Sequence, residues 1–266
     1  MSEATSPLSL LAHPYSRLVP FTGSAEHLRS QGRQRGTALV WTMADGVQPA
    51  CSELVGGRPG GLSLLIILPP GERITSDSNV MHLVQRSRPH GILPYHLHPA
   101  ASELAQVLRR PPADLAAEVT DYLTWRGLGV DRETAHVLRR IIDLSVELQS
   151  VSALSRSLYL SRRALGRRLM TRGLPVPSHW LQIGRLLRVA IKLQNSDATI
   201  SSIAYEFGYP DAFSVSNQML RIVGCRPSTA RERLGWEWLI EAWLRGEAEG
   251  GGLTPTIAGE IRAGAP

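Results

Sequence analysis

The sequence predicts two domains of different class: an α/β N-terminal domain with a parallel sheet, and an all-α C-terminal domain with two helix-turn-helix units joined by a linker helix. Short buried-strand patterns alternate with helical patterns before residue 110. Between residues 131 and 235 no strand pattern is present, and apolar residues follow a helical period. Within that second part, two segments share a plan in which one helix stops and another starts after a tight turn.

Length and composition are those of a globular protein with two cores. The chain has 266 residues, of which 43% are hydrophobic, and no apolar run approaches the roughly 18 residues that a membrane span needs. The N-terminus, MSEATSPLSLLAHP, lacks a basic leader, so we expect no signal peptide. Cys51 and Cys225 are far apart, which argues against a disulfide framework and favours a reducing, cytoplasmic location.

Positive charge is concentrated in one segment of the chain. Residues 151–234 hold 13 basic and 4 acidic residues, a net charge of +9, whereas the remainder holds 16 basic and 19 acidic residues, a net charge of −3. Such concentration is typical of a protein that binds a polyanion. A solvated basic surface would give the same count, so charge alone does not decide.

The N-terminal part is expected to hold a small α/β domain at residues 37–127, after a loosely ordered segment of residues 1–36 rich in Ser, Pro, Gly and Gln. The expected strands are 37–43, 61–68 and 90–95. The expected helices are 47–55, 74–87, 102–110 and 112–127.

The C-terminal part, residues 131–235, is expected to be helical throughout. Its helix-turn-helix units are VSALSRSLYLSRRALGRRLM (151–170) and TISSIAYEFGYPDAFSVSNQMLRIVG (199–224). In the second unit Gly208 can adopt a left-handed conformation that ends a helix, and Asp211 can cap the next one; Ser161 has the capping role in the first unit. Residues 236–266 are expected to form one short terminal helix and a flexible tail.

A long helix joins the two units. Ser178 can cap it, and it should run to about residue 194, a length of about 25 Å. Such a helix could hold the second helix of each unit, the recognition helix, in neighbouring major-groove turns roughly 34 Å apart. Its buried face is expected at Ile183, Leu187, Ala190 and Ile191, and its basic face at Arg185, Arg188 and Lys192.

Residues 136–234 resemble the AraC/XylS family of bacterial transcription regulators. The resemblance rests on ALSRSLYLSRRALGRRL, the connecting helix and IAYEFGYPDAFSVSNQMLRIVGCRPSTAR, whose spacing matches the family signature throughout. It implies a sequence-specific regulator that binds double-stranded promoter DNA. Because the sequence lacks a phosphate-binding loop, a nucleophile motif and a complete set of metal ligands, we expect no enzymatic activity, catalytic residue, metal or cofactor. RNA polymerase is a further expected partner, and a second copy of the chain is expected to pair through the N-terminal domain.

The first unit departs from the family pattern at two places. Leu158 and Tyr159 stand in the turn where family members often have glycine, so one of them is expected to be strained by about 1 kcal/mol. Gly166 lies inside the first recognition helix, where it costs about 1 kcal/mol of helix propensity.

In the first recognition helix, Leu165 and Leu169 should be buried. The outward residues should then be Arg162, Arg163, Gly166 and Arg167. An outward arginine can bind guanine with two hydrogen bonds or hold a phosphate. The candidates for base contacts are Arg162, Arg163, Gly166 and Arg167, of which the resemblance places the last three at positions that usually meet base edges. The candidates for phosphate contacts are Ser161 and Arg168, together with Arg185, Arg188 and Lys192 of the linker helix.

In the second recognition helix, Val215, Met219 and Ile222 form the expected buried stripe. Asn217 could bind the N6 and N7 atoms of adenine, and Phe213 could either touch a thymine methyl or pack into the core. The resemblance implies base contacts from Phe213, Ser216 and Asn217. Ser214 and Arg221 are the phosphate candidates.

The N-terminal domain loosely resembles a phosphorylation-type receiver domain in SLLIILPPGE and GILPYHLHPAASELAQVLRR. Its acidic cluster is missing, Asp45 comes late, and Tyr95 and His96 replace an expected lysine and proline. A degenerate receiver used for dimerisation or regulation is therefore the expectation.

Three alternatives accompany this interpretation. One is a DNA-binding architectural protein without sequence preference, and another is an enzyme-like α/β domain tethered to DNA, although no phosphate-binding loop or nucleophile motif supports the second. The third concerns His90, His96 and His98, which are either metal ligands or, more simply, polar histidines at a loop.

Overall fold

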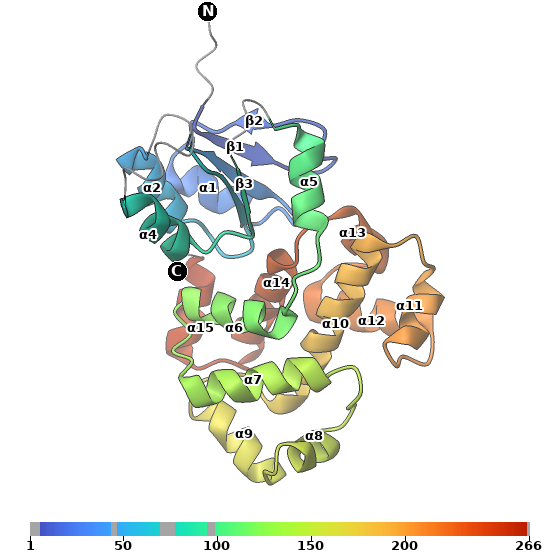
Figure 1. The fold of residues 1–266 in the computed structure, drawn as a ribbon. Helices are drawn as coiled ribbons and strands as arrows, with labels where there is room; N and C mark the ends of the chain where they lie inside the picture. Colours follow the sequence, from blue (N-terminus) through green and yellow to red (C-terminus); the bar gives the residue numbers. More distant parts are fainter. Residues whose placement is uncertain (1–5, 44–46, 70–77, 95–98, 265–266) are drawn as a thin grey trace, which may run out of the picture. The chain divides into compact units, whose positions relative to one another are not determined.

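The computed structural model describes residues 6–43, 47–69, 78–94 and 99–264. The chain divides into two compact units: unit 1 runs to Arg110 and includes Glu232–Trp238, and unit 2 comprises Pro111–Arg231 and Leu239–Gly264. Figure 1 shows strands in the first unit only and helices throughout the second. None of the helices within the described ranges is both long and apolar enough to cross a membrane.

Unit 1 contains a five-stranded mixed sheet in the order β2-β1-β3-β4-β5. β3, β4 and β5 are parallel and pair in register, with Leu39 opposite Leu64 and Ile66 opposite Ile92. β1 is antiparallel to both of its neighbours, β2 and β3. The strands are β1 Leu8–Leu11, β2 Val19–Pro20, β3 Ala38–Thr42, β4 Ser63–Ile67 and β5 Gly91–Leu93.

Helices cover both faces of this sheet. α1, α2 and α4 bury Leu28, Val55 and Val84 against one face, and α5 buries Leu104 and Leu108 against the other. Every residue of β4 is buried, which explains the apolar run at residues 64–67. The helices are α1 Ala25–Gln31, α2 Pro49–Gly56, α4 Ser78–Ser87 and α5 Ala101–Arg109.

Two expectations for the N-terminal part are corrected. The sheet is mixed rather than parallel, because β1 and β2 add two antiparallel pairings, and the receiver-like fold is not confirmed. Residues 6–36, expected to be loosely ordered, contain β1, β2 and α1, since Leu8 and Leu11 are buried in the two faces of the sheet. Asp45 and residues 95–98 lie outside the described residues.

A buried carboxylate joins the C-terminal segment of unit 1 to its sheet. Glu237 accepts hydrogen bonds from Ser63 Oγ at 2.8 Å and from the amide of Trp236 at 3.3 Å. His90 Nδ1 lies 2.7 Å from the same carboxylate, and Arg88 lies 3.8 Å away. The segment 232–238 is thereby bound to the start of β4 and to the loop before β5.

Unit 2 is built from helices alone among its described residues. The helices are α6 Leu115–Trp125, α7 Arg132–Leu144, α8 Val151–Ser157, α9 Arg162–Met170, α10 Pro177–Asn195, α11 Ile200–Glu206, α12 Ala212–Val223, α13 Pro227–Glu232, α14 Glu237–Gly250 and α15 Pro255–Ala263, of which α13 and α14 also contribute residues to unit 1.

The C-terminal helices differ from expectation in extent. The short terminal helix is α14, which runs to Gly250, and the tail expected to be flexible contains α15 with Ala258 and Ile261 buried. α6, expected in the front domain, belongs to unit 2. Its Arg126 forms a buried ion pair with Glu241 of α14 at 3.0 Å, so α6 and α14 hold each other in place.

We expect acid to weaken unit 1 through Glu237. Burial alone would raise the pKa of this carboxyl, but His90 and then Arg88 oppose it and lower the pKa to about 2. Because the folded pKa lies below the ordinary value of 4.5, this stabilisation is present above about pH 4.5 and is lost as the pH falls toward 2. The loss should reach roughly 3 kcal/mol of the free energy of unfolding.

Urea unfolding at a series of pH values measures this effect. Glu237→Gln should lower stability at neutral pH and flatten the profile between pH 4.5 and 2. Glu26→Gln, a change at an exposed position on α1, is the control that should leave the profile unchanged. Equal acid profiles for Glu237→Gln and the parent chain would contradict the assignment.

Candidate nucleic-acid interface

The two helix-turn-helix units are built from the same local interactions. Ser150 caps α8 by accepting a hydrogen bond from the Ala153 amide at 3.2 Å, and Thr199 caps α11 by accepting one from the Ser202 amide at 3.2 Å. Each of these helices is 7 residues long. The sequence therefore starts both units in the same way.

Both corners turn on a left-handed residue. Tyr159 has φ 55° in the first corner and Gly208 has φ 74° in the second. Beyond each corner the next amide bonds back across the turn: Leu160 donates to the Ser155 carbonyl at 2.9 Å, and Tyr209 to the Ala204 carbonyl at 2.9 Å. The strain expected at the first corner is thus confirmed at Tyr159, whose side chain is 97% exposed.

The second corner carries an additional anchor. Burial raises the pKa of Tyr209 to about 12, so its hydroxyl remains a hydrogen-bond donor even in alkaline solution. That hydroxyl donates to the side-chain carbonyl of Gln218 on α12. The corner therefore holds the helix that follows it.

The recognition helices α9 and α12 begin at side-chain caps. Ser161 accepts from the Ala164 amide at 3.1 Å, and Asp211 accepts from the Ser214 amide at 2.6 Å, which lowers the pKa of Asp211. Counting from these caps places corresponding residues of the two helices in pairs. The pairs are Arg163 with Phe213, Gly166 with Ser216, Arg167 with Asn217, and Met170 with Leu220.

The buried sides of both helices follow the expected spacing with one change. Leu165 and Leu169 of α9, and Val215 and Met219 of α12, are fully buried. Ile222 is only half-buried, and Val223 occupies the core instead. The opposite sides are therefore free to meet a partner.

The expected base-contact residues of α9 lie at the surface. Arg162, Arg163 and Arg167 are exposed, and Gly166 leaves open space where a side chain would stand. The arginines of this helix therefore surround a position, Gly166, that carries no side chain. Three guanidinium groups on one short helix can each bind guanine or a phosphate.

The outward side of α12 is uncharged around its centre. Phe213 is 73% exposed, so it is not tucked into the core between the helices. Asn217 is exposed as well, and both its amide donors and its carbonyl are available to a base edge. Ser216 donates its hydroxyl to the Ala212 carbonyl at 2.8 Å and retains only acceptor capacity.

The basic residues of the linker helix are engaged by protein groups. Arg185 donates to the Ser145 carbonyl at 3.0 Å and lies over the Tyr209 ring, 5.3 Å from its centre. Arg188 donates to the Ile142 carbonyl at 3.4 Å, and its guanidinium is 3.6 Å from the Asp143 carboxylate. The Lys192 ammonium bonds Glu206 of α11 at 2.9 Å. These groups brace α10 against α7 and α11, and a phosphate would have to compete for them.

The start of α10 also differs from expectation. Pro177 is its first residue and Val176 precedes it, so Ser178 is not the cap. Proline fits the first helical position because its missing N–H would have had no partner there. Ile191, expected to be buried, is half-buried and lines an apolar cavity of about 220 Å³ with Pro112 and Phe207.

The remaining phosphate candidates are less constrained. Arg168 is 38% exposed and 3.4 Å from Glu133, and Arg221 is exposed and 3.4 Å from Gln182. Ser161 and Ser214 lie in the first turns of their helices, where backbone amides favour an anion.

Arg172 and Leu220 belong to this surface although neither was expected there from the sequence. Arg172 forms an ion pair with Asp131, and both residues line a cavity of about 350 Å³ with Arg167, Arg168 and Thr171. The run RRLMTR gave the signal for this basic cavity, because arginines follow the helix into its C-terminal turn. Leu220 is 48% exposed on the outward side of α12.

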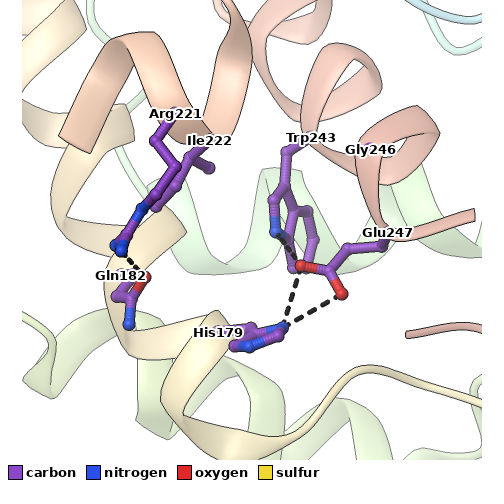
Figure 2. Close-up of a pocket in the computed structure, with 7 residues that line it drawn as sticks. All are labelled: His179, Gln182, Arg221, Ile222, Trp243, Gly246 and Glu247. Atoms are coloured by element: carbon purple, nitrogen blue, oxygen red, sulfur yellow. Dashed lines mark hydrogen bonds and ion pairs between the residues drawn. The ribbon is translucent and has the colours of Figure 1, made fainter. Parts of the chain in front are cut away.

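A second polar cavity of about 350 Å³ lies beside the C-terminal half of α12 (Figure 2). There the Glu247 carboxylate accepts a hydrogen bond from Trp243 Nε1 at 2.9 Å and lies 2.9 Å from His179 Nδ1. Arg221 points toward Gln182 on the other wall. The polar groups of this cavity thus form two separate sets, one around Glu247 and one that joins Arg221 to Gln182.

The described residues offer no group of three or more His, Cys, Asp or Glu that could hold a metal ion. Of the histidines considered from the sequence, His90 bonds Glu237, and His96 and His98 lie outside the described residues. His90 therefore has a structural partner in unit 1.

The segment that contains both recognition helices is similar to a known protein family. Residues 154–233 match a family model described as a helix-turn-helix domain. The match supports an AraC-like domain that binds double-stranded DNA, and it includes α9, α10 and α12. Neither a curated protein nor a solved structure matches the chain.

We expect Tyr159→Gly to stabilise unit 2 by up to about 1 kcal/mol, because it removes a side chain from the left-handed region. The matched control is Gly208→Ala, which should cost about 1 kcal/mol at the equivalent corner. Thermal unfolding of the two variants measures both effects. A lower midpoint for Tyr159→Gly would show that the tyrosine contributes more than its conformation costs.

Proposed function

We propose that the protein is a sequence-specific transcription regulator whose helices α9 and α12 read adjacent major-groove segments of promoter DNA. The observation that carries the proposal is the pair of equivalent corners, each of which presents a recognition helix with its outward side free. The helix-turn-helix match at residues 154–233 supports the DNA-binding part of it.

The two helices would divide the work of recognition. Arg162, Arg163 and Arg167 of α9 suit guanine, which offers its O6 and N7 as acceptors. Asn217 of α12 suits adenine, because an amide can both donate to N7 and accept from N6. Ser216 would accept from a base amino group, and Gly166 would let the DNA approach α9 closely.

Phosphate contacts would fix the register without carrying sequence information. Arg168, Arg221 and the first turns at Ser161 and Ser214 are the groups best placed for this role. Arg185, Arg188 and Lys192 are better explained as braces of the linker helix, since protein acceptors already engage them.

Two competing functions are less well supported. A nonspecific architectural protein would rely mainly on phosphate charge, whereas the centre of α12 presents Phe213, Ser216 and Asn217 without any charge. An enzyme-like unit 1 would need a catalytic constellation, and its buried polar cluster at Glu237 is closed by Ser63, His90 and Trp236.

Unit 1 is proposed to regulate or dimerise the protein. RNA polymerase as a partner and a cytoplasmic location belong to the same proposal, because both are expected of a regulator of transcription.

Selection of bound duplexes from a randomised DNA pool by the full-length chain tests the proposed function. An asymmetric site with two half-motifs about one helical turn apart is the expected result. The affinity for the selected duplex should fall steeply with salt because phosphate contacts release counterions. Binding without any enriched sequence would support the architectural alternative instead.

We expect Asn217→Ala to relax the preference at one base pair, at a cost of about 1–3 kcal/mol on the selected duplex. Arg168→Ala is the matched control: it should weaken the selected and random duplexes alike and reduce the salt slope by about 1. Titrations of both variants on both duplexes at several salt concentrations measure these effects. An equal loss on the two duplexes for Asn217→Ala would remove Asn217 from the base contacts.

A further inference from the structure

α12 carries a stripe of three residues on its outward side that differs from the corresponding stripe of α9. Phe213, Asn217 and Leu220 are spaced by four and three residues and therefore share one side of the helix. Phe213 is 73% exposed and Leu220 is 48% exposed, so two large apolar side chains flank one amide. No charged residue lies within this stripe.

Exposed apolar side chains gain free energy when an apolar partner surface covers them. In a major groove the apolar group is the 5-methyl of thymine, and side chains such as phenylalanine contact it directly. Residues 213 and 220 are separated by about 10 Å along a helix axis, which corresponds to about three base-pair steps of 3.4 Å. The amide of Asn217 stands between them, at the position suited to an adenine.

We infer that α12 recognises its half-site by thymine methyl groups, with Phe213 and Leu220 contacting two thymines about three base pairs apart and Asn217 binding an adenine between them. This inference rests on the proposed function and assigns Leu220 as a further specificity-determining residue. It makes the half-site of α12 rich in A·T pairs, in contrast to the guanines suited to the arginines of α9.

The corner and the cap support this use of the stripe. The Tyr209 hydroxyl donates to Gln218, and the Asp211 cap fixes the first turn, so α12 is held at its start. Arg221 follows Leu220 directly and is exposed, which places a cation where the helix leaves the stripe and can reach a phosphate. The apolar side chains are therefore presented by a helix whose rim carries a cation.

The test replaces single thymines of the selected duplex with deoxyuridine, which removes the 5-methyl group and keeps base pairing. In the α12 half-site, deoxyuridine at each of two thymines should weaken binding by the full-length chain about fourfold, the value of one buried methyl. Deoxyuridine outside these two positions should have no effect. A guanine·5-methylcytosine pair that restores the methyl at the same place should bind more tightly than a guanine·cytosine pair.

Variants assign each methyl to a side chain. Phe213→Ala and Leu220→Ala should weaken binding to the thymine duplex and each should become insensitive to deoxyuridine at one of the two positions. Met170→Ala is the matched control, because Met170 is 61% exposed at the equivalent position of α9 and should leave the effect in the α12 half-site unchanged. All three side chains are exposed, so their truncation should not disturb the core. Thermal unfolding checks that each variant is folded.

The outcomes separate this inference from the proposed function. An enriched motif whose α12 half tolerates deoxyuridine everywhere, or lacks thymine, would overturn methyl recognition and leave sequence-specific binding intact. Loss of enrichment altogether would overturn the proposed function. Phe213→Ala and Leu220→Ala chains that bind DNA normally would point to a protein partner for the stripe and would equally overturn the inference.

Discussion

The arrangement of unit 2 depends on the close approach of α10 to the end of α7. A Cβ atom at Gly184 would stand 3.0 Å from Ser145 Oγ and 3.3 Å from the Cα of Ile142, so any larger residue would press the two helices slightly apart. At that distance the carbonyls at the end of α7 lie within reach of arginines on α10, and Arg185 and Arg188 bind them. α10, which joins the two helix-turn-helix units, is therefore fixed by packing and by hydrogen bonds at the same place.

That constraint explains why both corners can differ in sequence and still work alike. One corner uses a strained tyrosine and the other an unstrained glycine, yet the amide after each makes the same bond back across the turn. Packing on α10 over-determines the geometry, since α9 and α12 both contact this helix. A local cost of about 1 kcal/mol at Tyr159 is small against the burial of Leu165 and Leu169.

Some of this structure could be predicted from the sequence because the signals were local. Gly208 and Asp211 define the second corner by their own conformational preferences, and the periodic leucines define the buried side of α9. The central strands were equally clear, because an apolar run such as LLII is typical of a strand that is buried on both faces of a sheet.

What could not be predicted depended on partners distant in sequence. β1 is only 4 residues long, and its apolar pattern becomes a strand only by pairing with β3. The arginines of α10 have the spacing of a solvated face, and their partners are carbonyls in the last turn and at the end of α7. The exposure of Leu220 could not be predicted for a related reason. An apolar residue next to a buried stripe is expected to be buried as well, whereas Leu220 is 48% exposed.

The course of the chain between the two units has a consequence for how such a protein can be divided or inherited. The backbone leaves unit 1 at Arg110, returns to it for Glu232–Trp238, and enters unit 2 again at Leu239. A cut just after the family-matched segment would strip Trp236 and Glu237 from unit 1, and would take from unit 2 the Glu241 that neutralises the buried Arg126. Neither unit is thus contiguous in sequence. Gene fusion or recombination that exchanged the DNA-binding segment would therefore also have to exchange the C-terminal helices and the residues that they contact in each unit.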